Sequence, residues 1–167
     1  MNDRLTEPVA RVAAALRRAG HPNGIVAFAE GTHTAADAAT AIGCSIAQIA
    51  KTIVFRAHRP DEPDVPVLVI ISGPERVDRT KVEALLGIGL LRADPAWIQD
   101  ACGFAVGGVS PIGVVGPVRF VIDEGLLSID PIWAAAGSPN HVFRTDVGWL
   151  RRLTGGVMAD VRVPLTL

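Results

Sequence analysis

Two apolar runs, Thr52 to Arg56 and Val67 to Ser72, lie on either side of a polar, Pro-rich segment, Ala57 to Pro66. Apolar runs of this length that are bounded by turn residues predict buried strands, and the short connection predicts that they form a hairpin. Other short strand-like and helix-like runs follow, but without the strict alternation that builds a parallel sheet. The sequence therefore predicts an α+β fold with a mixed sheet covered by helices.

The remaining elements are predicted from apolar spacing and from residues that begin or end helices. Thr34 and Asp37 have nearly the spacing of a capping box, and Asp94 followed by Pro95 is typical of a helix start. Helices are predicted over Leu5 to Leu16, Thr34 to Gly43, Ile46 to Ala50, Asp78 to Leu86 (with Leu85 and Leu86 facing inward), Asp94 to Ala101 and, capped by Thr145, Asp146 to Leu153. Strands are predicted over Ile25 to Ala29, Ile88 to Arg92, Arg119 to Asp123, Leu126 to Ile129, Trp133 to Ala136, Val142 to Arg144 and Val157 to Val163.

The 167 residues contain no repeat, no low-complexity tract and no convincing linker. We therefore expect a single domain over residues 1–167, which is long enough to bury a substantial core. No apolar run approaches the roughly 20 residues that span a bilayer, and Met1 to Glu7 carries no signal-peptide core. We expect a cytoplasmic protein without a membrane partner.

The charge balance limits the kinds of partner. The formal net charge is −1 at pH 7, whereas proteins that bind long stretches of nucleic acid usually carry a strong basic excess. We therefore expect no DNA binding. Any contact with nucleic acid should involve a short piece, such as a single-stranded end.

The residues that could hold a metal or act as a reactive thiol are scattered. Cys44 and Cys102 lack metal-binding spacing, and we predict that both are buried small apolar residues. No two histidines have the spacing of metal ligands, so neither a metal nor another cofactor is expected. No Gly-x-Ser-x-Gly elbow is present, so a serine hydrolase has no support.

Two of the 16 basic residues are lysines, Lys51 and Lys81. Lys51 stands directly before the strand Thr52 to Arg56, where partial burial would remove water from its ammonium group. Such a lysine can anchor a phosphate or polarise an ester carbonyl. The alternative is a lysine at the end of a helix whose stem lies along apolar surface. The spacing alone leaves both interpretations open.

Two loops could also contribute to a site. The segment Gly107 to Gly113 (GGVSPIG) has adjacent glycines that expose backbone amides and a proline that stiffens the turn, as an oxyanion hole requires. The segment Gly137 to His141 (GSPNH) places Asn140 and His141 on a second stiffened loop, where they could orient a substrate or a water molecule. Ordinary structural loops are the alternative in both cases.

Four segments, in this order and separation, resemble the YbaK and ProX family, also called the prolyl-tRNA synthetase-associated domain. They are the helix from Thr34, the segment Ile49 to Phe55, the loop Gly107-xxx-Pro111-x-Gly113 and the strand Phe120 to Asp123. The resemblance covers roughly Gly24 to Val163. Their ordered combination is specific, although no single motif is decisive.

The resemblance implies a compact, partly barrel-like mixed sheet with helices around it. It also implies a metal-free hydrolase that removes a small, wrongly attached amino acid, such as alanine or cysteine, from proline tRNA. The implied partners are the aminoacylated CCA end of a mischarged tRNA and, as a candidate, prolyl-tRNA synthetase. The apolar or small residues at 114–116 and the pair Pro139-Asn140 depart from the cysteine-specific type. The pair is more like the alanine-specific branch, so the amino acid stays open.

The site residues follow from the loops and the resemblance together. The family's lysine falls on Lys51, and its Gly-rich loop falls on Gly107 to Gly113. The expected catalytic residues are Lys51, Gly108, whose backbone would bind the oxyanion, and Ser110. The expected substrate-binding residues are Gly107, Pro111, Gly113, Ser138, Asn140 and His141.

Two alternatives to this function stay open. One is an inert module of the same fold that binds a tRNA end or a synthetase, although the presence of both Lys51 and the complete Gly-rich loop argues against it. The other is a hydrolase of a different small acyl ester. A panel of substrates would separate that hydrolase from an editing enzyme.

Overall fold

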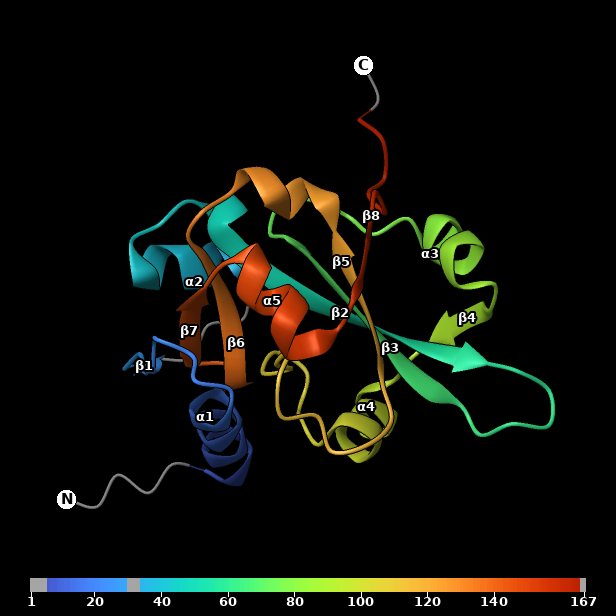
Figure 1. The fold of residues 1–167 in the computed structure, drawn as a ribbon, viewed down its shortest axis with the longest axis horizontal. Coiled ribbons are helices and arrows are strands. Elements are labelled where there is room, and N and C mark those ends of the chain that lie inside the picture. Colours follow the sequence, from blue (N-terminus) through green and yellow to red (C-terminus); the bar gives the residue numbers. More distant parts are fainter. Residues whose placement is uncertain (1–5, 30–33, 166–167) are drawn as a thin grey trace.

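The structure of the protein is a computed structural model that describes residues 6–29 and 34–165. The described residues form one eight-stranded sheet with helices around it (Figure 1). The strands are β1 (Ile25–Ala27), β2 (Ile49–His58), β3 (Val65–Ser72), β4 (Gly89–Arg92), β5 (Arg119–Asp123), β6 (Ile132–Ser138), β7 (His141–Thr145) and β8 (Val157–Ala159). The α-helices are α1 (Glu7–Arg18), α2 (Ala35–Ile42), α3 (Arg79–Leu86), α4 (Pro95–Cys102) and α5 (Val147–Thr154), and the 3-10 helices are η1 (Ile46–Gln48) and η2 (Glu124–Ser128).

The hairpin at the centre of the sheet is confirmed. Strands β2 and β3 pair antiparallel from Ala50↔Ser72 to Ala57↔Val65. The sheet order is β1-β7-β6-β2-β3-β5-β8, and β4 pairs with β2 beside this path. Because β2–β6, β3–β5 and β5–β8 are parallel while the other pairs are antiparallel, the predicted mixed α+β architecture is confirmed.

Strand β3 is apolar along its length because both of its faces are covered. Successive side chains of a strand point to opposite faces. Val67 and Val69 pack in the cluster that contains α3, whereas Leu68 and Ile70 pack with the helices of the other face. A continuous apolar run is what such a doubly covered strand requires.

Strands β2 and β6 pair over two residues, Ile49↔Trp133 and Ala50↔Ala134, and no further pair between them is present among the described residues. Beyond these two residues β2 pairs with β3 and β4, while β6 pairs with β7. The two parallel strands therefore separate near Lys51. This divergence positions the site described below.

Several predicted boundaries are wrong for a common reason. Lys51 is the third residue of β2 and not the residue before it, because η1 ends at Gln48. The segment Leu126 to Ile129 belongs to η2 and to the residue that follows it, and is not a strand. Strands β1 and β8 end at Ala27 and Ala159, earlier than expected. The ends of a strand depend on how far it pairs with neighbouring strands in the sheet, and the apolarity of a short segment does not indicate that pairing.

Three side chains also differ from expectation. Asp146, not Thr145, caps α5, since its carboxylate accepts the Trp149 amide at 2.8 Å. The Thr145 hydroxyl instead contacts His21 Nε2 at 3.0 Å. Leu85 is 38% exposed, contrary to expectation, whereas Leu86 packs inward as predicted, beside fully buried Val82.

Cys102 is fully buried as predicted, whereas Cys44 is only partly buried, and both are free thiols. Burial raises the pKa of Cys102 to about 11, which keeps this thiol protonated and inert. The predicted first residue of the N-terminal helix, Leu5, lies outside the described residues. Within residues 6–29 and 34–165, no helix is long and apolar enough to cross a membrane.

Candidate active site

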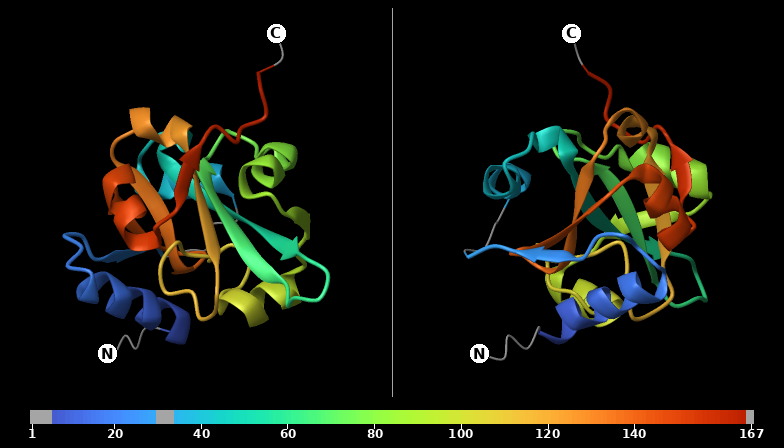
Figure 2. Two further views of the ribbon diagram at one scale, coloured as in Figure 1. Left: turned by 45° about the vertical axis from the view of Figure 1, so that its right-hand side comes forward. Right: turned by 60° about the vertical axis from the view of Figure 1, so that its left-hand side comes forward.

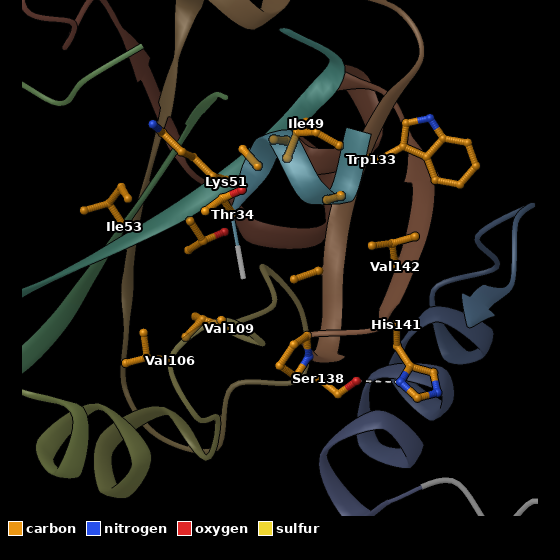
Figure 3. Close-up of a pocket in the computed structure, with 17 residues that line it drawn as sticks. Thr34, Ile49, Lys51, Ile53, Val106, Val109, Trp133, Ser138, His141 and Val142 are labelled. Carbon is orange, nitrogen blue, oxygen red and sulfur yellow. Dashed lines mark hydrogen bonds between the residues drawn. The ribbon is translucent and has the colours of Figure 1, made fainter. Parts of the chain in front are cut away.

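A cavity of about 290 Å³ opens where β2 and β6 diverge (Figure 3). Its walls come from α2 and the residue before it, the start of β2, the β6–β7 hairpin and the Gly-rich loop. Most of the lining is apolar. The side chains that can form hydrogen bonds there are those of Thr34, Lys51, Thr52, Trp133, Ser138 and His141. A concave, mostly apolar site with a few polar groups is typical of a small-molecule pocket.

Lys51 lies on one wall of the cavity, half-buried at the start of β2. Its ammonium group donates a hydrogen bond to the carbonyl of Gly73 at 2.9 Å. Loss of hydration lowers the pKa of Lys51; Glu75 opposes this shift, and Arg76 adds to it. A single bond to a neutral carbonyl leaves two of the three N–H groups of the ammonium for other acceptors. Lys51 is therefore a partly desolvated cation that can donate further hydrogen bonds to a ligand.

Close packing of Gly73 against η1 sets the position of the Gly73 carbonyl. A Cβ atom on Gly73 would lie 2.3 Å from the carbonyl oxygen of Ile46, which real Cβ contacts do not reach. Position 73, in the turn after β3, can therefore pack against η1 only if the residue is glycine. This packing brings the acceptor of Lys51 to the start of β2.

His141 lies on the opposite side of the cavity from Lys51, on the β6–β7 hairpin (Figure 3). Strand β6 runs to Ser138 and β7 begins at His141, so the predicted loop is reduced to Pro139 and Asn140. Asn140 holds this turn against the chain after β1. Its side-chain amide donates to the carbonyl of Phe28 at 3.2 Å, and the Phe28 amide donates to the carbonyl of Asn140 at 2.8 Å.

Hydrogen bonds on this turn determine which nitrogen of His141 carries the proton. Because the Asn140 NH₂ group faces Phe28, its Oδ1 accepts the Ser138 hydroxyl at 2.8 Å. That bond uses the single proton of Ser138. The 2.5 Å contact between Ser138 Oγ and His141 Nδ1 must therefore be donated by the histidine. In neutral His141 the other nitrogen, Nε2, is then a proton acceptor.

This direction of donation matters chemically. In a nucleophilic serine the hydroxyl donates to the histidine that removes its proton. Here the histidine donates to Ser138, whose oxygen also accepts the Asn140 amide at 3.2 Å. Ser138 and Asn140 therefore orient His141, and the basic lone pair of the group is on His141 Nε2.

The Gly-rich loop packs directly on this hairpin through Gly108. The Gly108 carbonyl accepts the Gly137 amide at 3.1 Å, and a Cβ atom on Gly108 would lie 2.7 Å from Ser138 Cα. The Gly108 amide, however, donates to the carbonyl of Ala105 at 3.0 Å. In this conformation it is not free to bind an oxyanion, contrary to the role expected from the sequence.

Several amides of the loop have no hydrogen-bond acceptor among the described residues, and two of them belong to residues of the cavity lining. Gly107 and Val109 both line the cavity, and within the described part of the chain their backbone N–H groups have no hydrogen-bond acceptor. Unpaired amides beside a cavity are suited to an anionic or strongly polar ligand atom. These two amides, and not that of Gly108, are therefore the candidates for contact with such an atom.

The other predicted loop residues do not line the cavity. Ser110 is fully buried, and its hydroxyl accepts the amide of Ile112 at 3.3 Å, which stabilises the loop from below. Pro111 is also buried. Gly113 has φ +83° and packs against Val12 of α1. These three residues shape the loop, and no substrate in the cavity would touch them in this conformation.

Three polar residues of the cavity lining, Thr34, Thr52 and Trp133, were not among the expected site residues. Trp133 lines it and packs with the cluster of α2, and its place at the start of a predicted strand did not indicate this. Thr52 also lines it, and its buried hydroxyl has no hydrogen-bond partner among the residues that the structure describes. Only its position next to Lys51 could have drawn attention to it. The described residues contain no group of three or more His, Cys, Asp or Glu that could hold a metal ion.

The mixed sheet, the cavity at its diverging strands and the loop of free amides define an α+β domain built around a site for a small ligand. The sequence model of the aminoacyl-tRNA editing domain matches residues 29–153. The chain therefore belongs to the aminoacyl-tRNA editing domain family. The matched range contains the cavity and excludes α1.

Solved and curated relatives agree with this assignment. A structure described as "Crystal structure of a putative trans-editing enzyme for prolyl tRNA synthetase" is 35% identical, with a TM-score of 0.86 over 96% of this chain and 99% of that one. The uncharacterized protein YwhH of Bacillus subtilis (strain 168) is 28% identical over 71% of this chain and 73% of its own length. A proline–tRNA ligase of Limosilactobacillus fermentum is 36% identical over 58% of this chain, which spans only 17% of that ligase.

Proposed function

We propose that the protein hydrolyses the ester bond of mischarged tRNA and thereby removes a small, wrongly attached amino acid, with proline tRNA as the first candidate. One observation carries the proposal: a small cavity lined on one side by Lys51, whose ammonium is partly desolvated, and on the other by His141, whose imidazole is oriented by Ser138, in a chain of the editing domain family. The likeness to a structure described as a trans-editing enzyme and to a segment of proline–tRNA ligases supports proline tRNA.

In the proposed mechanism the aminoacyl group of the CCA end enters the cavity. Lys51 donates to the ester carbonyl or to an oxygen of the terminal nucleotide, and the amides of Gly107 and Val109 bind the oxygen that becomes negative as the carbonyl is attacked. Donors placed in advance at developing charge commonly provide the largest part of catalysis. None of these three groups has to form or break a covalent bond.

The attacking oxygen comes from water. As its bond to the carbonyl carbon forms, its proton passes to His141 Nε2, and the bond between that carbon and the ribose oxygen breaks; His141 then returns the proton to the ribose oxygen. In the alternative route the neighbouring ribose hydroxyl accepts the proton of the water while it gives its own proton to the leaving ribose oxygen. The products are a free amino acid and tRNA with an intact terminal ribose, so atoms and charges balance without a cofactor.

Selectivity would follow from the size of the cavity. Ile49, Ile53, Trp133 and Val142 surround the space into which an amino-acid side chain would project. Such a pocket excludes larger side chains by steric overlap, but distinguishes side chains that differ by one methylene by only about 1–3 kcal/mol. We therefore expect overlapping activity on alanine, serine and cysteine, and a much lower rate on proline.

The test is the hydrolysis of proline tRNAs charged with alanine, serine, cysteine or proline by the wild type and by Lys51→Met. Lys81→Met is the matched control, because Lys81 lies on α3 and contacts Asp160 and the carbonyl of Arg162, away from the cavity. The proposal expects the wild type and Lys81→Met to cleave a mischarged species and Lys51→Met to lose the activity.

If all three folded proteins leave every ester intact, the proposed activity on these tRNAs is wrong. An inert binding module would then still retard the tRNA in a gel, whereas a hydrolase of a different acyl ester would act on other small esters. If Lys51→Met retains full activity, the role of the ammonium is wrong even though hydrolysis stands.

A further inference from the structure

Helix α1 lies outside the range matched by the family model, yet it touches both loops of the site. A Cβ atom on Gly137 of the β6–β7 hairpin would lie 2.9 Å from the carbonyl oxygen of Pro8, and one on Gly113 would lie 3.4 Å from Val12. Figure 2 shows α1 next to the yellow loop segment in both views. The helix therefore supports the hairpin and the Gly-rich loop at the same time.

One side chain of α1, Arg11, joins the two ends of the loop. Its Nε donates to the carbonyl of Gly113 at 2.5 Å, and its Nη2 donates to the carbonyl of Gly103 at 2.7 Å. The guanidinium carbon also lies 4.6 Å from the ring centre of Phe104, which is fully buried. The third nitrogen, Nη1, pairs with exposed Glu7 at 2.7 Å.

Gly103 and Gly113 bracket the segment that carries the free amides of Gly107 and Val109. A planar guanidinium presents its donors in a fixed fork, so a single Arg11 holds the two carbonyls at a set separation. The stack on Phe104 fixes the plane of that fork against the core. The loop between the two glycines is thus closed by a side chain that lies 92 residues before Gly103 and 102 residues before Gly113 in the sequence.

We propose that Arg11 is a positioning residue for the site: by bridging Gly103 and Gly113 it holds the amides of Gly107 and Val109 at the edge of the cavity. Its effect on the rate rests on the proposed deacylase function, whereas its effect on the loop does not. A displacement on the order of 1 Å in a catalytic group can lower a rate on the order of 10²-fold. Arg11 touches no atom of the cavity and acts through the loop.

Three variants separate this role from general stability. Arg11→Met keeps an unbranched apolar side chain and removes the guanidinium with all of its donors. Arg11→Lys keeps the charge but offers a compact ammonium that cannot bridge both carbonyls with a planar fork. Glu7→Gln is the control, because it removes the exposed ion pair of the same guanidinium and leaves its two loop contacts in place.

Two measurements are made on the full chain. Hydrogen exchange followed by mass spectrometry should show faster exchange over residues 103–113 in Arg11→Met, with β2 and β3 as protected as in the wild type. Kinetics on the best mischarged substrate should show kcat lowered on the order of 10–100-fold with a smaller change in KM, because the amides act on the developing oxyanion. Arg11→Lys should fall between, and Glu7→Gln should match the wild type in both measurements.

Each outcome decides a separate point. Unchanged exchange over 103–113 in folded Arg11→Met overturns the positioning role, and faster exchange with an unchanged kcat overturns its importance for the reaction. Equal loss of protection in β2 and β3 reduces Arg11 to general stability and also overturns the proposal. If Arg11→Met does not fold, the same comparisons are made with Arg11→Lys. If the wild type cleaves no substrate, the proposed function fails, and the exchange data still decide the role of Arg11 in the loop.

Discussion

Replacing Gly108 by alanine should damage the site and the fold together, because this glycine is the point where the two site loops touch. The new methyl group would lie 2.7 Å from Ser138 Cα, 2.8 Å from Ser138 N and 2.9 Å from the Gly137 carbonyl carbon. Ordinary contact begins at 3.4 Å, so the loop and the hairpin must separate by roughly 0.7 Å, since all three neighbours are backbone atoms that cannot rotate away.

This separation determines how much stability and activity Gly108→Ala should lose. Overpacking of this kind lowers the free energy of unfolding by about 1–3 kcal/mol. It also weakens the bond between the Gly137 amide and the Gly108 carbonyl and moves Ser138, which orients His141, relative to the free amides of the loop. A shift approaching 1 Å between catalytic groups lowers kcat on the order of 10²-fold.

The assay combines urea unfolding with deacylation kinetics for Gly108→Ala and for the control Gly24→Ala. Gly24 has no positive φ, and apart from its two chain neighbours no atom of residues 6–29 and 34–165 lies within 4 Å of the position that its Cβ would take. The control should therefore match the wild type in both measurements. If Gly108→Ala is as stable and as active as Gly24→Ala, the contact between the loop and the hairpin does not hold the site, and the reasoning is refuted.

Two further predictions concern Ser138 and Lys51. Ser138→Ala removes the oxygen that accepts the His141 Nδ1–H bond, so kcat should fall by roughly the factor of 10 that one hydrogen bond represents. A loss on the order of 10⁴-fold or more would instead indicate a serine nucleophile and contradict the assigned tautomer. The half-buried ammonium of Lys51 has a pKa below its ordinary value of 10.5, because burial removes part of its hydration. Since the charged form is the active donor, kcat/KM, corrected for uncatalysed hydrolysis, should be full below the lowered pKa of Lys51 and decline as the pH rises through it. A rate that stays constant until an exposed lysine would titrate contradicts this role.

Features that depend on neighbouring residues were predictable from the sequence. The pattern around the Pro-rich segment predicted the β2–β3 hairpin, and Asp94 with Pro95 predicted the start of α4, where the Asp94 carboxylate accepts the Trp97 amide at 2.9 Å. The capping box at Thr34 and Asp37 is present as well. These features are local because capping and turn formation involve residues three or four positions apart. The resemblance carried by the ordered motifs likewise predicted the family.

The limits of elements that need a distant partner were not predictable. The apolar segment after β5 is equally compatible with a strand and with η2, and it forms η2, with no strand paired to it in the described part of the chain. The turn before His141 shortened to two residues because β6 and β7 pair up to Ser138↔His141. Pairing partners lie elsewhere in the chain, so local patterns carry no information about them.

The candidate site likewise has features that the sequence predicted and features that only the tertiary structure showed. The sequence identified Lys51 and both loops, since a lone lysine at a strand and paired glycines are visible as residue types. Only the tertiary structure showed that the Gly108 amide is used by Ala105, that Ser110 lies beneath the loop and that Arg11 ties the loop to α1. Residue type determines which bonds a group can form, whereas contacts between remote segments determine which of those bonds are already made and which are left for a ligand.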